Sequence, residues 1–483
     1  MLEVVGVDEM RAIDEEARRE TPVEELVERA GAAVYRAVIA ELRRSPGRSE
    51  GRPGGRGFPY GKRAIVIAGK GHNGDDGRVA AARLRSRGMK VEVLDAARAP
   101  ARLVDVDIVI DAAYGTGFRG SYDAPEIPPG ALAIAVDIPS GLDADTGECA
   151  GAPMGADRTV SFAALKPGLL LGEGLLHAGS ITVADIGLDV SRASVRVIED
   201  SDVELLLPQR AFDAHKWRSG VAIVAGSEGM MGSAVLCSNA AARSGAGMVR
   251  LGVPGCSAAG LPVSEVVSRA IPGSSWSDAA VSIAERCKAL VVGPGLGRGG
   301  PEGESVRRVL AASPIPVVLD GDGLWALGEG HDALAACAAS RSALVLTPHD
   351  GELRRLIGST PGPDRIGCAR QVAASTGAVA LLKGPCTVIA DPGGEVLLAV
   401  SGSARLATAG SGDVLSGIIA AFIARGVEPF LAAALGAHVH GRAASLGLAD
   451  GLVAGDLGEL VARWLSEKAT GAPGSLERSP VSR

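Results

Sequence analysis

The amino-acid sequence predicts an α/β protein of two domains, each built on a mainly parallel β-sheet. The chain has 483 residues, more than one compact core normally holds. Short apolar runs alternate with helical segments, and this alternation favours a parallel sheet with helices on both faces. Residues 190–210 carry mixed charge and end at Pro208, as a domain junction often does. We therefore expect domains at residues 1–205 and 206–470, followed by a polar, disordered tail at 471–483.

The first half is predicted to begin with two helices and to continue as alternating strands and helices. Helices are expected at 8–20 and 23–42, because apolar residues such as Leu26, Ala30 and Val34 keep helical spacing. Residues 45–61 are rich in Gly, Pro and Arg and read as a flexible insertion. Buried strands are predicted at 64–68, 91–94, 106–111 and 132–138, with a helix at 77–88.

The second half repeats this pattern. Its apolar runs predict strands at 221–225, 248–253, 289–292, 316–319, 343–346, 379–382 and 386–390. His438 and His440 lie in a helical stretch, and two histidines two residues apart face different sides of a helix. We interpret both as structural residues.

Composition excludes several classes of function. Aromatic residues make up only 3% and the formal net charge is −7, which argues against a nucleic-acid surface. The N-terminus is charged from residue 3, and no run of about 18 apolar residues occurs, so neither a signal peptide nor a membrane span is expected. The seven scattered cysteines include no CxxC pair, which argues against a zinc knuckle or a disulfide framework. We expect a cytoplasmic protein.

The run ATAGSGDVLSG (407–417) is the strongest single signal. A glycine loop that leads into a helix offers free backbone N–H groups and the positive end of the helix dipole, which together bind phosphate. Asp413 follows Gly410 and Gly412 and stands where a base could accept the proton of an attacking hydroxyl. The alternative is that Asp413 is only the N-cap of a buried helix.

Three polar loops follow predicted strands in the first half: AGKGHNGDDG (68–77), DAAYGTGFRG (111–120) and VDIPSGLDADTG (136–147). Because ligands bind beyond the carboxyl ends of parallel strands, these loops should converge on one crevice.

These loops, in this order, resemble those of the NAD(P)HX epimerase family over residues 8–190. The resemblance implies a Rossmann-like three-layer domain in which Asn73, Asp111 and Ser140 hold a potassium ion and Asp137 is catalytic. It further implies that Asn73, Asp76 and the segment Gly115, Thr116 and Gly117 bind the substrate. His72 and Asp75 depart from the family pattern, which has asparagine and glycine at these positions.

In the second half, polar groups follow five predicted strands. The segments are HKWRSGVAIVAGS (215–227), VVGPGLG (291–297), VVLDGDGL (317–324), LTPHDGEL (346–353) and LLKGPCTVIA (381–390). Glycines, acids, a histidine and a lysine ahead of a phosphate-binding helix suit phosphoryl transfer.

This half resembles the ADP/ATP-dependent NAD(P)H-hydrate dehydratases, which are ribokinase-like, over residues 207–465. The resemblance implies a C-terminal ribokinase-like three-layer domain with Asp413 as the catalytic base and a magnesium ion on the nucleotide phosphates. By the same resemblance Gly295 and His349 face the substrate, and the nucleotide lies against Lys383, Gly384, Thr387, Gly410 and Gly412.

The two resemblances together imply a bifunctional enzyme. One domain would epimerise R- and S-NAD(P)HX (hydrated NADH or NADPH), and the other would dehydrate the S epimer at the expense of ADP or ATP. An alcohol kinase with an N-terminal binding module is the alternative, and a first domain that serves only as a scaffold is another. The abundant Ala and Gly would also let subunits pack closely, so a homo-oligomer is expected.

Overall fold

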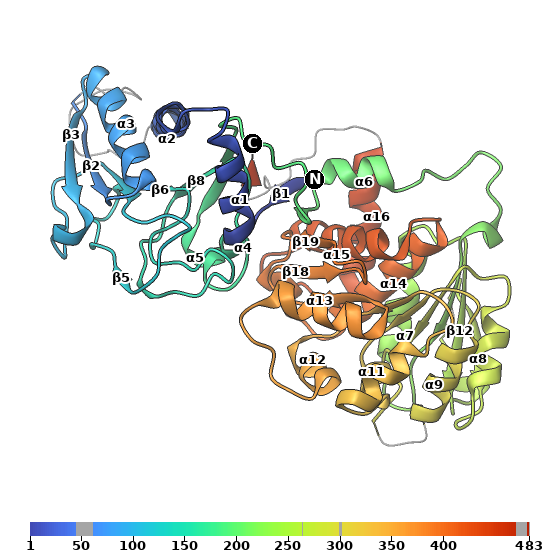
Figure 1. Cartoon of the computed structure of the whole chain (residues 1–483). Helices are drawn as coiled ribbons and strands as arrows, with labels where there is room; N and C mark the ends of the chain where they lie inside the picture. The colour runs from blue at the N-terminus through green and yellow to red at the C-terminus, as the bar shows by residue number, and fades with distance from the viewer. Residues whose placement is uncertain (45–60, 263, 299–301, 470–480, 483) are drawn as a thin grey trace. The chain divides into compact units, whose positions relative to one another are not determined.

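The computed structural model describes residues 1–44, 61–262, 264–298, 302–469 and 481–482. The predicted insertion at 45–61 and tail at 471–483 therefore lie almost entirely outside the described residues. The chain divides into two compact units. The N-terminal unit comprises Leu2–Ala193 together with Arg478–Arg483, and the C-terminal unit comprises Ser194–Glu477 together with Met1. Figure 1 shows the elements of each unit.

The N-terminal unit contains a parallel sheet, as the sequence predicts, and its strand order is β20-β9-β8-β6-β4-β2-β3. The four strands predicted in this half are confirmed, whereas β8, β9 and β20 were not predicted. Its strands are β2 (Arg63–Ala68), β3 (Lys90–Asp95), β4 (Ile108–Ala112), β6 (Leu132–Val136), β8 (Arg158–Phe162), β9 (Ser180–Ala184) and β20 (Val481–Ser482). β5 (Tyr122–Asp123) and β7 (Gly151–Ala152) form a separate pair, and β1 covers Leu2–Val4. Its helices are α1 (Val7–Ala17), α2 (Val23–Arg44), α3 (His72–Ser86), the one-turn helices α4 (Pro167–Leu170) and α5 (Gly174–His177), and the 3-10 turn η1 (Ala96–Arg98).

The two faces of this sheet are covered differently. Alternate residues of β2 point to opposite faces, as in any strand. Val66 packs with the apolar sides of α2 and α3, whereas Ile65 and Ile67 pack with Leu103, Tyr122 and Met154. One face is thus covered by two long helices. The other face is covered largely by the residues that connect the strands.

The C-terminal unit contains a larger sheet with the order β10-β19-β18-β17-β16-β15-β14-β11-β12-β13. Its strands are β10 (Val195–Val197), β11 (Gly220–Val224), β12 (Met248–Pro254), β13 (Val267–Ile271), β14 (Ala289–Val292), β15 (Val317–Leu319), β16 (Leu344–Leu346), β17 (Val379–Leu382), β18 (Thr387–Ala390) and β19 (Val396–Ala399). The predicted strands are confirmed. The sheet is parallel except at β17-β18-β19, which are antiparallel because a four-residue turn reverses the chain after Leu382.

Helices pack on both faces of this sheet. Its apolar core joins the central strands to α7 (Met231–Arg243), α14 (Ser411–Ala424), α15 (Pro429–Ser445) and α16 (Ala454–Ala469). The remaining helical segments are α6 (Asp200–Leu206), α8 (Ser277–Ala284), α9 (Glu302–Ala312), α10 (Asp322–Ala326), α11 (Gly330–Ala338), α12 (Asp350–Ile357), α13 (Arg365–Thr376), η2 (Lys216–Ser219), η3 (Ala258–Gly260) and η4 (Ala404–Leu406). His438 and His440 are buried in α15, and His438 Nε2 lies 2.8 Å from Asp200 Oδ1.

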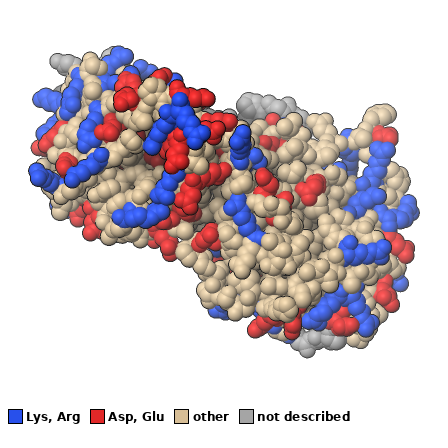
Figure 2. Space-filling model, in the orientation of Figure 1, with Lys and Arg blue, Asp and Glu red and all other residues tan. Residues whose placement is uncertain are grey.

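Charged side chains of both signs are intermixed on the visible face of each unit (Figure 2). Several exposed charged groups of the protein form ion pairs, such as Arg29 with Glu25 and Arg102 with Glu126. Among the described residues, no helix combines the length and apolar character needed to cross a bilayer.

Candidate active sites

The N-terminal unit has a cavity of about 890 Å³ at the carboxyl ends of its strands. Helix α3 starts at His72, earlier than the predicted 77, so the second part of the glycine loop forms its first turns. Asn73 and Asp76 therefore project from a helix start rather than from a loop. The cavity is lined by all the residues that the sequence placed against substrate in this half, together with Asp137: Asn73, Asp76, Gly115, Thr116, Gly117 and Asp137.

Asp111 and Ser140 are buried and form a closely bonded pair. The Ser140 hydroxyl donates to Asp111 Oδ1 at 2.6 Å, and the Ser140 amide donates to Asp111 Oδ2 at 2.9 Å. Burial raises the pKa of Asp111, although these hydrogen bonds act in the opposite direction. Both polar atoms of the Asn73 amide are buried, and neither has a hydrogen-bond partner among the residues that the structure describes. A buried amide without partners is costly, so this position fits a ligand that supplies them.

Asp137 is joined to a buried lysine that the sequence analysis did not single out. Lys166 is 2% exposed, and its ammonium contacts Asp137 Oδ1. The same ammonium donates to the Phe162 carbonyl at 2.9 Å and to the Ser161 hydroxyl at 3.2 Å. Asp137 adopts a left-handed backbone conformation with φ +65°, which is uncommon outside glycine and often occurs at functional sites. Both Asp137 and Lys166 line the cavity.

Two further carboxyl groups in this cavity have raised pKa values. Burial, with the charges of Asp137 and Asp75 adding to it, raises the pKa of Asp76 to about 8. Asp76 therefore carries a proton at neutral pH and can donate a hydrogen bond. Burial also raises the pKa of Asp14, a residue of α1 that the sequence analysis did not select.

The two residues that depart from the family pattern occupy different places. Asp75 lies outside the cavity lining and receives a hydrogen bond of 2.9 Å from Arg78. Its charge is thus compensated on the helix surface. His72 does line the cavity, and its Nδ1 lies 3.8 Å from Asp75 Oδ2.

In the C-terminal unit the predicted phosphate loop leads into α14, as the sequence indicates. Gly410 precedes the helix with φ +90°, a conformation that suits glycine and turns the chain into the helix. Asp413 lies in the first turn. Burial raises the pKa of Asp413 to about 6, and the charge of Asp320 adds to this effect, while a hydrogen bond with Ser233 opposes it. A carboxyl group with a pKa near 6 is well matched to accept a proton at neutral pH.

Asp320 holds three groups in place beside this helix. It is 1% exposed, and Lys383 Nζ lies 2.6 Å from its Oδ1. Thr347 also donates to Oδ1 at 2.7 Å, and Ser416 of α14 donates to Oδ2 at 2.8 Å. Burial by itself lowers the pKa of Lys383, but the charges of Asp320 and Glu352 outweigh it and leave the pKa raised. Lys383 is therefore a fixed positive charge beside α14.

A Cβ atom at Gly412 would lie only 3.1 Å from Lys383 Nζ, so this glycine allows the lysine to approach the helix start. Gly384 follows Lys383, and Arg365 donates to the Lys383 carbonyl at 2.8 Å. Thr387 opens β18, and its hydroxyl donates to the Gly384 carbonyl at 3.4 Å. The structure thus places Lys383, Gly384 and Thr387 on one short turn between two strands.

His349 caps α12 through its Nδ1, which accepts hydrogen bonds from the amides of Gly351 and Glu352 at 3.0 and 3.3 Å. A neutral imidazole that accepts at Nδ1 carries its proton on Nε2, and His349 Nε2 lies 3.5 Å from Glu352 Oε1. The Gly295 carbonyl accepts a hydrogen bond from Ser227 at 2.9 Å. A further cavity of about 420 Å³, bordered by Arg210, Lys216 and Arg425, has none of the predicted site residues in its lining.

Comparison with known families agrees with the order of the two units. The family of YjeF-related protein N-termini matches residues 23–103 and 94–168, and the NAD(P)H-hydrate dehydratase family matches residues 221–464. Similar solved structures include an ADP/ATP-dependent NAD(P)H-hydrate dehydratase from Bacillus subtilis co-crystallized with ATP and Mg²⁺. It is 26% identical, covers 56% of this chain and 97% of its own, and has a TM-score of 0.45.

Two curated relatives are named bifunctional NAD(P)H-hydrate repair enzymes. The relative from Moorella thermoacetica is 36% identical, over 79% of this chain and 82% of that protein. The relative from Mycobacterium tuberculosis is also 36% identical, over 89% of this chain and 90% of that protein. Because both halves match in order and the identity extends over most of each relative, the chain belongs to the family of bifunctional NAD(P)H-hydrate repair enzymes.

Proposed function

We propose that this protein repairs hydrated NADH and NADPH through two activities. The N-terminal unit epimerises R- and S-NAD(P)HX, and the C-terminal unit dehydrates S-NAD(P)HX with ADP or ATP as the phosphoryl donor. The observation that carries this proposal is Asp413, a carboxyl group with a raised pKa in the first turn of a phosphate-binding helix, beside the fixed charge of Lys383. We propose domain limits close to the two compact units.

The dehydration would proceed in two steps. Asp413 accepts the proton of the ring hydroxyl while that oxygen attacks the terminal phosphoryl group, and the remaining nucleotide departs. The ring nitrogen then donates electron density as the carbon–oxygen bond to phosphate breaks, and loss of a proton from the adjacent carbon restores the double bond. Lys383, Gly384, Thr387, Gly410 and Gly412 would bind the nucleotide, and Gly295 and His349 would face the substrate.

Magnesium would arrive bound to the nucleotide phosphates and offset their charge. Asp320 Oδ1 accepts hydrogen bonds from both Lys383 and Thr347, so this oxygen has no lone pair left to bind the ion directly.

Epimerisation requires one group that moves a proton on and off the hydrated ring. We assign this role to Asp137, which lines the cavity and is held by Lys166. Asp76, Gly115, Thr116 and Gly117 would bind the rest of the dinucleotide.

A potassium ion fits the position beside Asn73, Asp111 and Ser140. Within the described part of the chain the buried Asn73 oxygen has no other partner, and oxygen donors with a single carboxylate suit a weakly held monovalent cation. The ion would contribute positive charge beside the cavity that Asn73 lines. Titrating K⁺ into protein freed of monovalent metals, with Asn73→Ala as the comparison, would test this assignment.

One assay separates the two activities. Starting from a mixture of both epimers with Mg²⁺ and ADP or ATP, the wild-type protein should restore all of the absorbance at the NADH band. Asp137→Asn should rapidly restore only the S fraction, and Asp413→Asn should restore neither. Accumulation of a phosphorylated alcohol without NADH would instead indicate a kinase. Rapid repair of both epimers by Asp137→Asn would indicate that Asp137 is not the epimerisation residue.

We also propose a cytoplasmic location, which the seven free cysteines support. Self-association stays a prediction that light scattering coupled to size-exclusion chromatography would test.

A further inference from the structure

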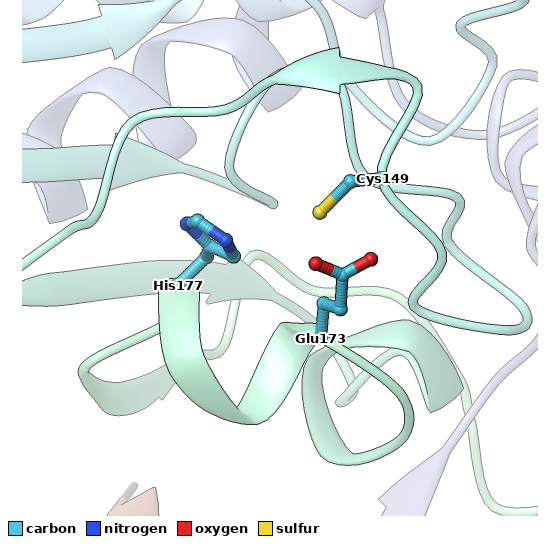
Figure 3. A group of neighbouring side chains, drawn as sticks. All are labelled: Cys149, Glu173 and His177. Atoms are coloured by element: carbon cyan, nitrogen blue, oxygen red, sulfur yellow. The ribbon is translucent and has the colours of Figure 1, made fainter.

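Three potential metal ligands meet in the N-terminal unit, apart from the cavity described above. Cys149 precedes β7, Glu173 directly precedes α5, and His177 is the last residue of α5. One donor atom from each residue lies within 4.8 Å of those of the other two. Figure 3 shows the thiol, the carboxylate and the imidazole directed toward one another. None of the three residues lines the 890 Å³ cavity.

Backbone contacts hold the two segments of this cluster together. Glu173 and His177 are four residues apart, so one helical turn places both side chains on the same side of α5. The Glu173 amide donates to the Gly147 carbonyl at 3.0 Å, which fixes the start of α5 against the segment that carries Cys149. Cys149 itself forms a β-bridge with Leu142. The arrangement is therefore set by the fold rather than by chance contact of long side chains.

One atom of the cluster indicates a missing partner. His177 Nδ1 is buried and has no hydrogen-bond partner among the described residues. A buried polar atom without a partner is unfavourable, and a bound cation would supply the partner. Burial, together with the charge and hydrogen bond of Glu173, raises the pKa of the Cys149 thiol to about 11.

The donor set selects the class of metal. A thiolate, an imidazole and a carboxylate are the ligand types of Zn²⁺, whereas Mg²⁺ and Ca²⁺ prefer oxygen ligands alone. Ligand atoms around a tetrahedral zinc ion lie about 3.5 Å apart, so the cluster needs side-chain shifts of only about 1 Å to close. We propose that Cys149, Glu173 and His177 bind a divalent transition-metal ion of the zinc class, with a fourth position left to water.

Metal binding would release the thiol proton to solvent and would link the segment that carries Cys149 to α5. Because the cluster lies outside the substrate cavity, we expect the ion to stabilise the N-terminal unit and not to take part in the reaction.

Cobalt titration of the untagged full-length protein, stripped with a chelator, tests this proposal. Co²⁺ should bind one ion per chain and produce the near-ultraviolet charge-transfer band of a thiolate ligand. Zn²⁺ should displace it, and binding of either ion to the metal-free protein should release about one proton per ion at pH 7.5. Zn²⁺ should also raise the melting temperature of the N-terminal unit.

Cys149→Ser and His177→Gln should each weaken Zn²⁺ binding at least 100-fold in calorimetry, and Cys149→Ser should abolish the charge-transfer band. Cys368→Ser and His331→Gln change a partly exposed cysteine and an exposed histidine of the other unit. These matched controls should change neither the Zn²⁺ affinity nor the charge-transfer band. Glu173→Gln changes the third ligand and keeps the size of the side chain. Circular dichroism would report whether each variant is folded. An unchanged band in Cys149→Ser, or the absence of stoichiometric binding to the folded wild-type protein, would overturn the proposal.

Discussion

Replacing Asp413 by Asn should stabilise the protein while it abolishes dehydration. The folded structure raises the pKa of Asp413 from 3.8 to about 6. Each unit of pKa corresponds to 1.36 kcal/mol, so the ionised carboxylate destabilises the folded state by about 3 kcal/mol. Asn has nearly the same shape without the charge. At pH 8 we therefore expect the free energy of unfolding of the variant to exceed that of the wild type by up to about 3 kcal/mol. Its melting temperature should rise by on the order of 5 °C.

The pH dependence distinguishes this cause from a general packing effect. A carboxyl group with a higher pKa in the folded state binds its proton more tightly there. The protonated carboxyl group therefore makes its full contribution to the free energy of unfolding below pH 4. This contribution is lost as the pH rises to about 6 and the group ionises. The advantage of Asp413→Asn should be greatest above pH 6 and should disappear near pH 4.

Calorimetry of the C-terminal transition between pH 4 and pH 8, with the exposed Asp450→Asn as control, measures this difference. Dehydration should fall at least 100-fold in Asp413→Asn, as expected on removing a general base. A variant that is no more stable than the wild type at pH 8, or that keeps the same advantage at pH 4, would refute the reasoning.

Three further substitutions test other contacts. In the wild type we expect the substrate KM of epimerisation to rise above pH 8, where Asp76 loses its proton. Asp76→Asn should leave epimerisation nearly unchanged at pH 7 and should abolish that rise. A wild-type KM that stays constant up to pH 9.5 would contradict this. Lys166→Met should destabilise the N-terminal unit by about 3–5 kcal/mol in urea unfolding because it leaves Asp137 without its buried partner, and the double variant with Asp137→Asn should regain most of this loss. Gly412→Ala should raise the KM for ADP about tenfold, since its methyl group meets Lys383 Nζ, while epimerisation stays at the wild-type rate; equal loss of both activities would instead indicate unfolding.

The strands and the polar groups at their ends were predictable from the sequence. A buried strand reads as an apolar run, and a polar residue directly after it must lie at the edge of the sheet. This reasoning placed Asp111, Asp137, Asp320 and Lys383 correctly at strand ends. It did not give the direction of β18, because an apolar run of four residues looks the same in parallel and antiparallel sheets. It also missed several strands, among them β8, β9, β13 and β19.

Contacts between distant segments were not predictable from the sequence. Lys166 stands in an ordinary run, ALKPG, where a lysine is expected to face solvent, and only the fold shows that it is buried against Asp137. Asp14 is one of several acids on an amphipathic helix, and nothing in its spacing marks it as the one that lines the cavity. Cys149 has no CxxC partner, and its neighbours Glu173 and His177 come from a later segment. Such contacts depend on tertiary structure, which local patterns do not encode.

The hydrogen bonds of the C-terminal unit decide which acid can serve as the base. Sequence reasoning offered Asp320, Asp322, Glu352 and Asp413 as acids near the phosphate loop. The base must lie where the transferred phosphoryl group would bind. The first three acids instead hold neighbouring protein groups: Asp320 binds Lys383, Thr347 and Ser416, Asp322 binds Gly297 and Arg298, and Glu352 binds the His349 amide. Asp413 combines burial, a pKa raised to about 6 and a place at the positive end of α14, where the transferred phosphoryl group would bind. The same fold thus uses Asp320 to fix the lysine and places Asp413, the base that we propose, at the start of α14.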